Sequence, residues 1–170
     1  MVGRRRIGWA GALLLAAAAV FIGRSLGDRD AAQIPRQFDR LVTDTEKRGH
    51  EGLEAGARAR AIAAAFVETP RLALAPVADG ERSRAELVSL VFQTRSLLDF
   101  LKIRVHSREL EFAPDRRRAV LRVTAEVLGY GGGYEERGVR AARIEWERTD
   151  EGWRIAAVQA ETPLRPLPPP

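Results

Sequence analysis

A regular alternation of apolar and polar residues in the C-terminal half most constrains the fold of this 170-residue chain. Successive side chains of a strand point to opposite faces, so such alternation indicates a strand buried on one side only. The pattern is clearest over residues 119–128. There, one face would carry only apolar side chains, which are Ala119, Leu121, Val123, Ala125 and Val127.

Three further strands are predicted by the same period of two. One spans residues 103–112, and its apolar phase changes partway, which predicts a β-bulge near 107–109. The other two cover 142–147 and 153–157, after a glycine-rich hairpin segment over 129–133. Because the connections are of hairpin length, we expect an antiparallel meander of four strands.

The N-terminal half of the body has helical periodicity instead. Residues 36–68 contain no proline, but Gly49 and Gly52 weaken the middle of the segment. We therefore expect either one long helix or two helices broken near these glycines, ended by Pro70. Residues 71–80 are expected to form a short edge strand or an extended connection.

A second helical region is expected over residues 81–100, where Ser83 and Glu86 have the spacing of a capping box. Its apolar stripe consists of Leu87, Val88, Val91, Phe92 and Leu98. Helices followed by a block of strands predict an α+β domain. In such a domain the helices pack on one face of a curved four-stranded antiparallel sheet.

Residues 7–23 form an uncharged apolar run with three arginines before it and Arg24 after it. As a helix the run spans about 26 Å, close to the thickness of a bilayer's hydrocarbon core. We expect a single-pass anchor in the inner or plasma membrane over residues 1–26, with a cytoplasmic N-terminus and an extracytoplasmic, periplasmic body. A cleaved signal peptide is the alternative, although no small-residue cleavage site follows the run. A linker over 27–35, a domain over 36–161 and a disordered proline-rich tail over 162–170 complete the organisation.

The net charge of +5 does not predict binding to nucleic acid. Residues 1–30 hold five arginines against two aspartates, so most of the excess belongs to the membrane flank. In the body, acidic and basic residues are interspersed, as on a solvated surface. The absence of cysteine excludes disulfides and thiolate chemistry, and two distant histidines do not predict a metal site. No cofactor is expected.

The order of these segments resembles that of the NTF2-like superfamily. The resemblance is carried by the helix at 81–100, the strand pair at 108–127 and, above all, the closing hairpin ARIEWERTDEGWRIAAVQAE at 142–161. It implies a cone-shaped, cystatin-like α+β fold. The middle of that fold is shortened here to residues 69–80, which implies a shallow pocket. Enzymes of the superfamily place an Asp, a Tyr or a His–Asp pair inside the cone.

No acid or base lies on the predicted inward face of this chain. The expected ligand pocket is apolar and is formed by Leu121, Val123, Ile144, Trp146, Trp153 and Ile155. His106 and Glu126 are the candidates for acid–base chemistry, but both are expected to face solvent. His50 and Glu51 lack the second histidine of a zinc-protease motif.

Two functional hypotheses follow. The first is a non-catalytic, membrane-anchored domain that binds a partner protein or a small apolar ligand at a bacterial-type cell envelope. The second is a small cofactor-free enzyme of the isomerase or dehydratase type, which would need an acid or base in the cone. A homodimer is a further expectation from the resemblance, because the outer sheet face is used for dimerisation in this fold.

Overall fold

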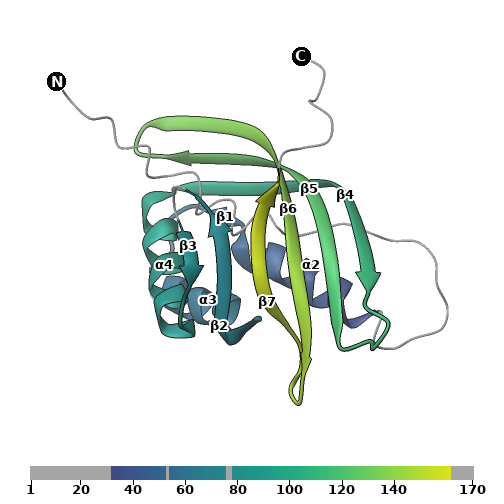
Figure 1. Ribbon diagram of the computed structural model, residues 1–170. Helices are drawn as coiled ribbons and strands as arrows, with labels where there is room; N and C mark the ends of the chain where they lie inside the picture. The colour runs from purple at the N-terminus through teal and green to yellow at the C-terminus, as the bar shows by residue number, and fades with distance from the viewer. Residues whose placement is uncertain (1–31, 53, 76–77, 162–170) are drawn as a thin grey trace.

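The computed structural model describes residues 32–52, 54–75 and 78–161, which form three helices and a curled seven-stranded sheet (Figure 1). The predicted anchor, most of the linker and the proline-rich tail lie outside these residues. Along the chain the elements are α2 (Gln33–Thr45), β1 (Lys47–Arg48), α3 (Glu54–Ala63), β2 (Phe66–Leu74), β3 (Ala78–Glu81), α4 (Arg84–Leu97), β4 (Phe100–Phe112), β5 (Arg118–Gly131), β6 (Tyr134–Thr149) and β7 (Gly152–Glu161).

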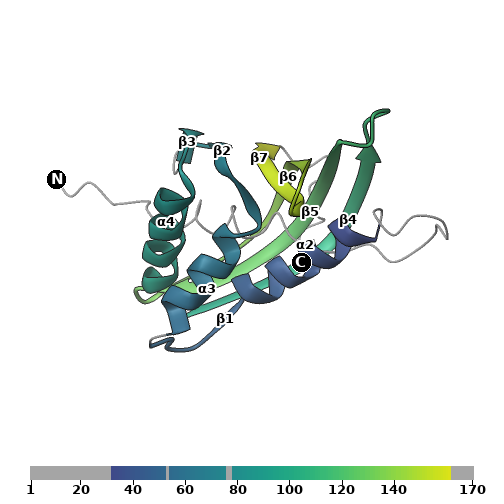
Figure 2. The same ribbon diagram turned by 90° about the horizontal axis from the view of Figure 1, so that it is seen from below.

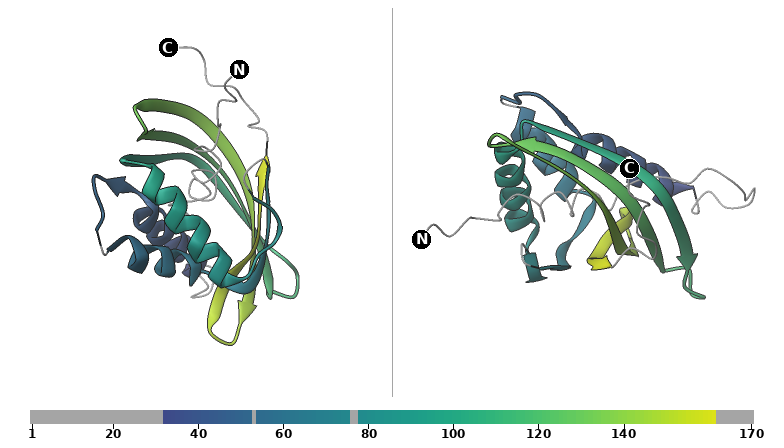
Figure 3. Two further views of the ribbon diagram at one scale, coloured as in Figure 1. Left: turned by 90° about the vertical axis from the view of Figure 1, so that its left-hand side faces the viewer. Right: turned by 90° about the horizontal axis from the view of Figure 1, so that it is seen from above.

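The α+β class and the antiparallel meander are confirmed, but the expectation of four strands is wrong. The sheet has the order β1-β4-β5-β6-β7-β2-β3. Strands β4 to β7 are the predicted meander, and three strands from the first half of the chain extend it at both edges. β2 pairs in parallel with β7, so the sheet is mixed. The helices lie against the concave face of the curl (Figures 2 and 3).

The break between the first two helices is confirmed near the glycines that predicted it. Helix α2 ends at Thr45 and α3 begins at Glu54, with Gly49 between them at a φ of 106°. The expectation that Pro70 ends the second helix is wrong, because α3 ends at Ala63. Pro70 lies inside β2, where Phe66, Leu72 and Leu74 are buried against the core.

Local signals at α4 and β4 are confirmed closely. Ser83 caps α4 and completes the capping box, because its hydroxyl accepts from the backbone N–H of Glu86 and the Glu86 carboxylate accepts from the backbone N–H of Ser83. The bulge in β4 falls between Val105 and Ser107, next to the predicted segment. The glycine-rich hairpin is a two-residue turn, since β5 ends at Gly131 and β6 begins at Tyr134.

Candidate functional site

The six residues predicted to form a ligand pocket all face the concave side of the sheet and are closed off from solvent. None is more than 3% exposed. They share one hydrophobic core with side chains of α2, α3 and α4. The predicted residues are Leu121, Val123, Ile144, Trp146, Trp153 and Ile155.

Two of these residues bury polar atoms without a partner. The indole nitrogens of Trp146 and Trp153 are fully enclosed, and neither donates a hydrogen bond to another described residue. The ring of Phe112 meets Trp153 edge to face, with 5.7 Å between the ring centroids. Buried donors usually find an acceptor, so these two N–H groups are an unpartnered polar feature of a largely apolar concave face.

Sequence reasoning missed one charged pair on this face. Arg108 projects inward, because it shares a phase with Leu110 and Phe112 beyond the bulge. Its Nη1 donates to Asp39 Oδ1 of α2 at 3.2 Å, and its guanidinium lies 5.9 Å from the centroid of the Phe38 ring. Burial lowers the pKa of Arg108, while Asp39 acts in the opposite direction. The signal was present, since the change of phase that predicted the bulge turns residue 108 inward.

His106 and Glu126 lie together on the convex face, as expected for solvent-facing residues. His106 Nε2 is 3.9 Å from Glu126 Oε2. Glu126 also accepts a hydrogen bond from Arg137 Nε on the neighbouring strand. This hydrogen bond, together with the charges of Arg137, His106 and Arg104, lowers the pKa of Glu126. Glu126 is therefore ionised in a surface network, and neither residue reaches the concave face.

A second group of buried polar residues joins the ends of two helices. Arg95 of α4 is 1% exposed and donates to the carbonyl oxygens of Asp44 at 3.0 Å, Thr45 at 2.7 Å and Glu46 at 3.3 Å. Its Nε donates to Glu51 Oε2 at 3.0 Å, and its Nη2 bonds the other oxygen of that carboxylate. These bonds satisfy the carbonyls at the C-terminal end of α2.

Lys47 makes the reciprocal contact. Its Nζ donates to the carbonyl oxygen of Arg95 at 2.8 Å and to that of Leu98, at the C-terminal end of α4. Each helix is thus capped by a cation from the other segment, where the helix dipole favours positive charge. This arrangement is structural, because the buried cations of Arg95 and Lys47 donate to backbone carbonyls and to the Glu51 carboxylate.

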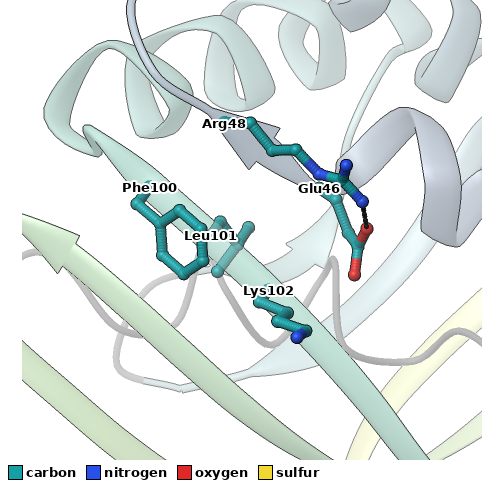
Figure 4. A pocket seen from close by; sticks show the side chains of 5 residues that line it. All are labelled: Glu46, Arg48, Phe100, Leu101 and Lys102. Atoms are coloured by element: carbon teal, nitrogen blue, oxygen red, sulfur yellow. Dashed lines mark ion pairs between the residues drawn. The ribbon is translucent and has the colours of Figure 1, made fainter.

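A shallow pocket of about 260 Å³ lies beside this group, at the point where β1 ends against β4 (Figure 4). Glu46 spans it, accepting from the backbone N–H of Ile103 at 3.2 Å and pairing with Arg48 at 3.8 Å. Its walls are formed by Glu46, Arg48, Phe100, Leu101 and Lys102. Both cations are exposed, so the pocket has the character of an open sheet edge.

Two kinds of site are absent from the described residues. In the described ranges, no group of three or more His, Cys, Asp or Glu side chains is placed to hold a metal ion. No helix within those ranges is long and apolar enough to cross a membrane, and residues 7–23 lie outside them.

Comparisons with known proteins identify the fold. No family model matches the chain, and no curated protein sequence matches it. An NTF2-like protein with a cystatin-like fold from Novosphingobium aromaticivorans is similar in structure, with a TM-score of 0.59 and 20% identity over 81% of this chain and 84% of that one. A proposed aromatic ring hydroxylase from the same organism gives a TM-score of 0.65 at 13% identity, over 84% and 94% of the two chains.

A proposed dehydratase of the NTF2-like family from Streptomyces avermitilis gives a TM-score of 0.60 at 13% identity. It is matched over its whole length by 82% of this chain. These likenesses show that residues of this chain form an NTF2-like, cystatin-like α+β fold, as the sequence pattern predicted. At such low identities they concern the fold alone.

Proposed function

We propose that this chain is a membrane-anchored, extracytoplasmic domain that binds a partner protein and catalyses no reaction. The anchor is inferred from the apolar run at residues 7–23 and its arginine flanks. The lack of catalysis is inferred from the chemistry of the core.

The observation that carries the proposal is the kind of ionisable side chain that the core contains. The buried charged residues in the described part of the chain are Lys47, Arg95 and Arg108, and all three are cations. Each is held by carbonyl or carboxylate oxygens. A general base must be unprotonated at working pH and close to the proton it removes, which a buried arginine is not. The concave face therefore supports binding better than proton transfer.

A small apolar ligand is the second candidate for what is bound. The concave face is lined by apolar side chains, and the unpartnered indole N–H groups of Trp146 and Trp153 could donate to a ligand oxygen. Such a ligand would have to open the core, because both tryptophans are 1% exposed. A partner protein on the outer surface needs no such opening.

Turnover measurements test the absence of catalysis. Similar structures include proposed dehydratases and a proposed hydroxylase, so the full-length protein is incubated with hydroxylated aromatic compounds and cyclic ketones. We expect no product above the buffer background, and the same for His106→Ala and Glu126→Ala. Turnover that either substitution abolishes would establish the isomerase or dehydratase alternative.

Tryptophan fluorescence separates the two binding modes. In full-length protein carrying Trp9→Phe, the remaining emission comes from Trp146 and Trp153. We expect apolar carbonyl compounds to leave this emission unchanged. A saturable change in wavelength, abolished by Trp153→Phe, would favour the small-ligand candidate.

Alkaline extraction tests the anchor. We expect the full-length chain to remain in the membrane pellet at high pH. We also expect protease added to spheroplasts with an intact inner membrane to digest the body. A variant in which three residues within 12–18 are replaced by arginine is the matched control, and alkaline extraction should release it into the supernatant. Recovery of the unaltered chain in the supernatant would contradict an uncleaved anchor.

A further inference from the structure

Within the described ranges, the outer side of β4 is a sheet edge that is open over most of its length. β1 pairs only with Phe100 and Leu101, so β4 has no strand partner on that side from Lys102 to Phe112 in the described part of the chain (Figures 1 and 4). An edge of this length presents backbone donors and acceptors to another strand. Ile103 shows the direction of these groups, because its N–H points outward to the Glu46 carboxylate.

The charges along this edge are sorted into two halves. Lys102 and Arg104 are the exposed charges before the bulge, and Glu109 and Glu111 are the exposed charges after it. All four lie on the convex face, since they stand opposite Leu128, Glu126, Arg122 and Val120 of β5, respectively. One strand thus carries a basic half and an acidic half on the same face.

We propose that β4 pairs antiparallel with β4 of a second copy, about a two-fold axis that passes between residues 106 and 107. In such an isologous contact the same strand from the two copies runs in opposite directions, so each residue pair occurs twice. Lys102 then lies opposite Glu111 of the second copy, and Arg104 lies opposite Glu109 of the second copy. The two sheets become one continuous sheet, with four ion pairs across the junction.

The bulge makes this register self-consistent. In a regular strand, residues 102 and 111 would lie on opposite faces, because side chains alternate with a period of two. The extra residue at the bulge moves the acidic half onto the face of the basic half. In the same register Ile103 lies opposite Leu110, so that inward-facing apolar residues also meet. Pairing replaces the Glu46 carboxylate on the Ile103 N–H with a backbone carbonyl.

The convex face is a poorer surface for self-association. Ion pairs within one chain already cover it, including Arg137–Glu126 and Arg143–Glu145, the latter at 3.1 Å. Packing two such faces together would desolvate these charges, which is costly. Pairing through the β4 edge instead joins backbone groups of the two strands and leaves the charged side chains near solvent. The proposal is independent of whether the domain is catalytic.

A charge-exchange experiment tests the contact in full-length protein that carries two different affinity tags. Lys102→Glu with Arg104→Glu makes the edge wholly acidic, and Glu109→Lys with Glu111→Lys makes it wholly basic. We expect each variant to lose self-association by about a hundredfold or more, since four attractive pairs become repulsive. Mixing the two variants should restore association, because all four pairs are again attractive.

The mixed sample also controls for misfolding, since unfolded variants would not recover. Arg143→Glu with Glu145→Lys is the matched exchange in the middle of the convex face, and it should leave self-association unchanged. A monomeric unaltered protein, variants that self-associate normally, or a mixture that fails to associate would each overturn the proposal. Loss of association in the central variant alone would assign the contact to the convex face instead.

Cysteine cross-linking tests the register, because the chain has no cysteine of its own. Chains with Arg104→Cys and Glu109→Cys, or with Lys102→Cys and Glu111→Cys, should form disulfide-linked dimers readily. The mismatched combinations use the same four substitutions in the other pairing, which is Arg104→Cys with Glu111→Cys and Lys102→Cys with Glu109→Cys. They should form disulfide-linked dimers at least tenfold more slowly. Equal rates for all four combinations would contradict the register.

Discussion

Arg95 shows how a charged side chain can form part of the core of this domain. It occupies the position one turn beyond Val91 on the buried stripe of α4. Its guanidinium replaces the water that would otherwise solvate the last carbonyls of α2, and the Glu51 carboxylate balances its charge. A charge buried in this way costs little only while every partner is present.

Replacing Arg95 with Met should therefore lower the free energy of unfolding by about 3–5 kcal/mol, the cost typical of breaking a buried ion pair. The substitution removes the donors to three carbonyl oxygens and leaves the Glu51 carboxylate with its ion pair to Arg58 at 3.5 Å. Urea denaturation of the full-length protein measures the change. Arg40→Met, at an exposed position on α2, is the control and should stay within about 0.5 kcal/mol of the unaltered chain.

The Glu126 network should make a small, pH-dependent contribution. Because folding lowers the pKa of Glu126, its ionised form stabilises the fold above the unfolded pKa, and this effect is lost as the pH falls through the folded pKa. Glu126→Gln should cost about 0.5 kcal/mol at pH 7, as expected for a pair whose Arg137 side chain is 69% exposed. Thermal unfolding should show the difference vanish in acid. Arg137→Met should reproduce both results, and a constant difference from pH 7 to pH 3 would contradict them.

The residues of the site differ in how far sequence could reveal them. The inward apolar set on β5, β6 and β7 was predictable, because one face of each strand is turned toward solvent. Apolar and polar residues therefore alternate along these strands. The inward orientation of Arg108 was predictable only if the bulge was placed one or two residues before the predicted segment 107–109, where the structure has it. The contacts of Arg95 and Lys47 join residues 48 apart in the chain, and no local pattern specifies such a pair.

At the scale of elements, the β5–β6 hairpin packs against the end of α4. Gly131 packs directly against the backbone of Leu97, and a Cβ there would lie 2.2 Å from the Leu97 carbonyl oxygen. The N–H of Asp99 also donates to the carbonyl of Tyr130 at 2.8 Å. The hairpin and the helix end are therefore fixed to each other by backbone contacts.

Gly131→Ala should force the hairpin and α4 apart and destabilise the fold by about 1–3 kcal/mol, the usual range for overpacking. Its φ is not positive, so the effect comes from the contact and not from backbone strain. Gly52→Ala is the matched control, since its added methyl meets nothing within 4 Å. Chemical denaturation should show a stability loss for the first substitution and none for the second.

The elements that sequence missed are those without a regular one-sided pattern. β2 has an irregular burial pattern, with two exposed residues in succession at Glu68 and Thr69 before the buried Pro70. It also pairs in parallel with β7, so it lacks the alternation of the meander strands. β1 has only two residues, too few to show any period. α4 and the hairpins were predicted because a capping box and glycine turns act locally.

At the scale of the whole molecule, the proposed dimer and the proposed anchor reinforce each other. A membrane confines the anchored copies to two dimensions, so a weak edge contact is populated at low expression. The ion pairs at the junction lie near solvent, where salt screens them.

Raising the ionic strength should accordingly weaken self-association. Between 0.05 M and 0.5 M salt we expect the dissociation constant of the full-length protein to rise by about tenfold, as four partly exposed ion pairs are screened. Fluorescence energy transfer between two labelled populations measures it. Protein in which all four edge charges are replaced by glutamine should associate more weakly and show little dependence on salt.

The parallel pairing of β2 with β7 determines when this domain can complete its fold. β2 contributes Leu72 and Leu74 to the core, but its partner strand ends at Glu161, the last described residue. A chain made from the N-terminus holds these leucines without their β7 partner until residues 152–161 have been synthesised. The proposed extracytoplasmic body would have to cross a membrane unfolded, and a sheet that closes only when β7 pairs with β2 would delay its folding.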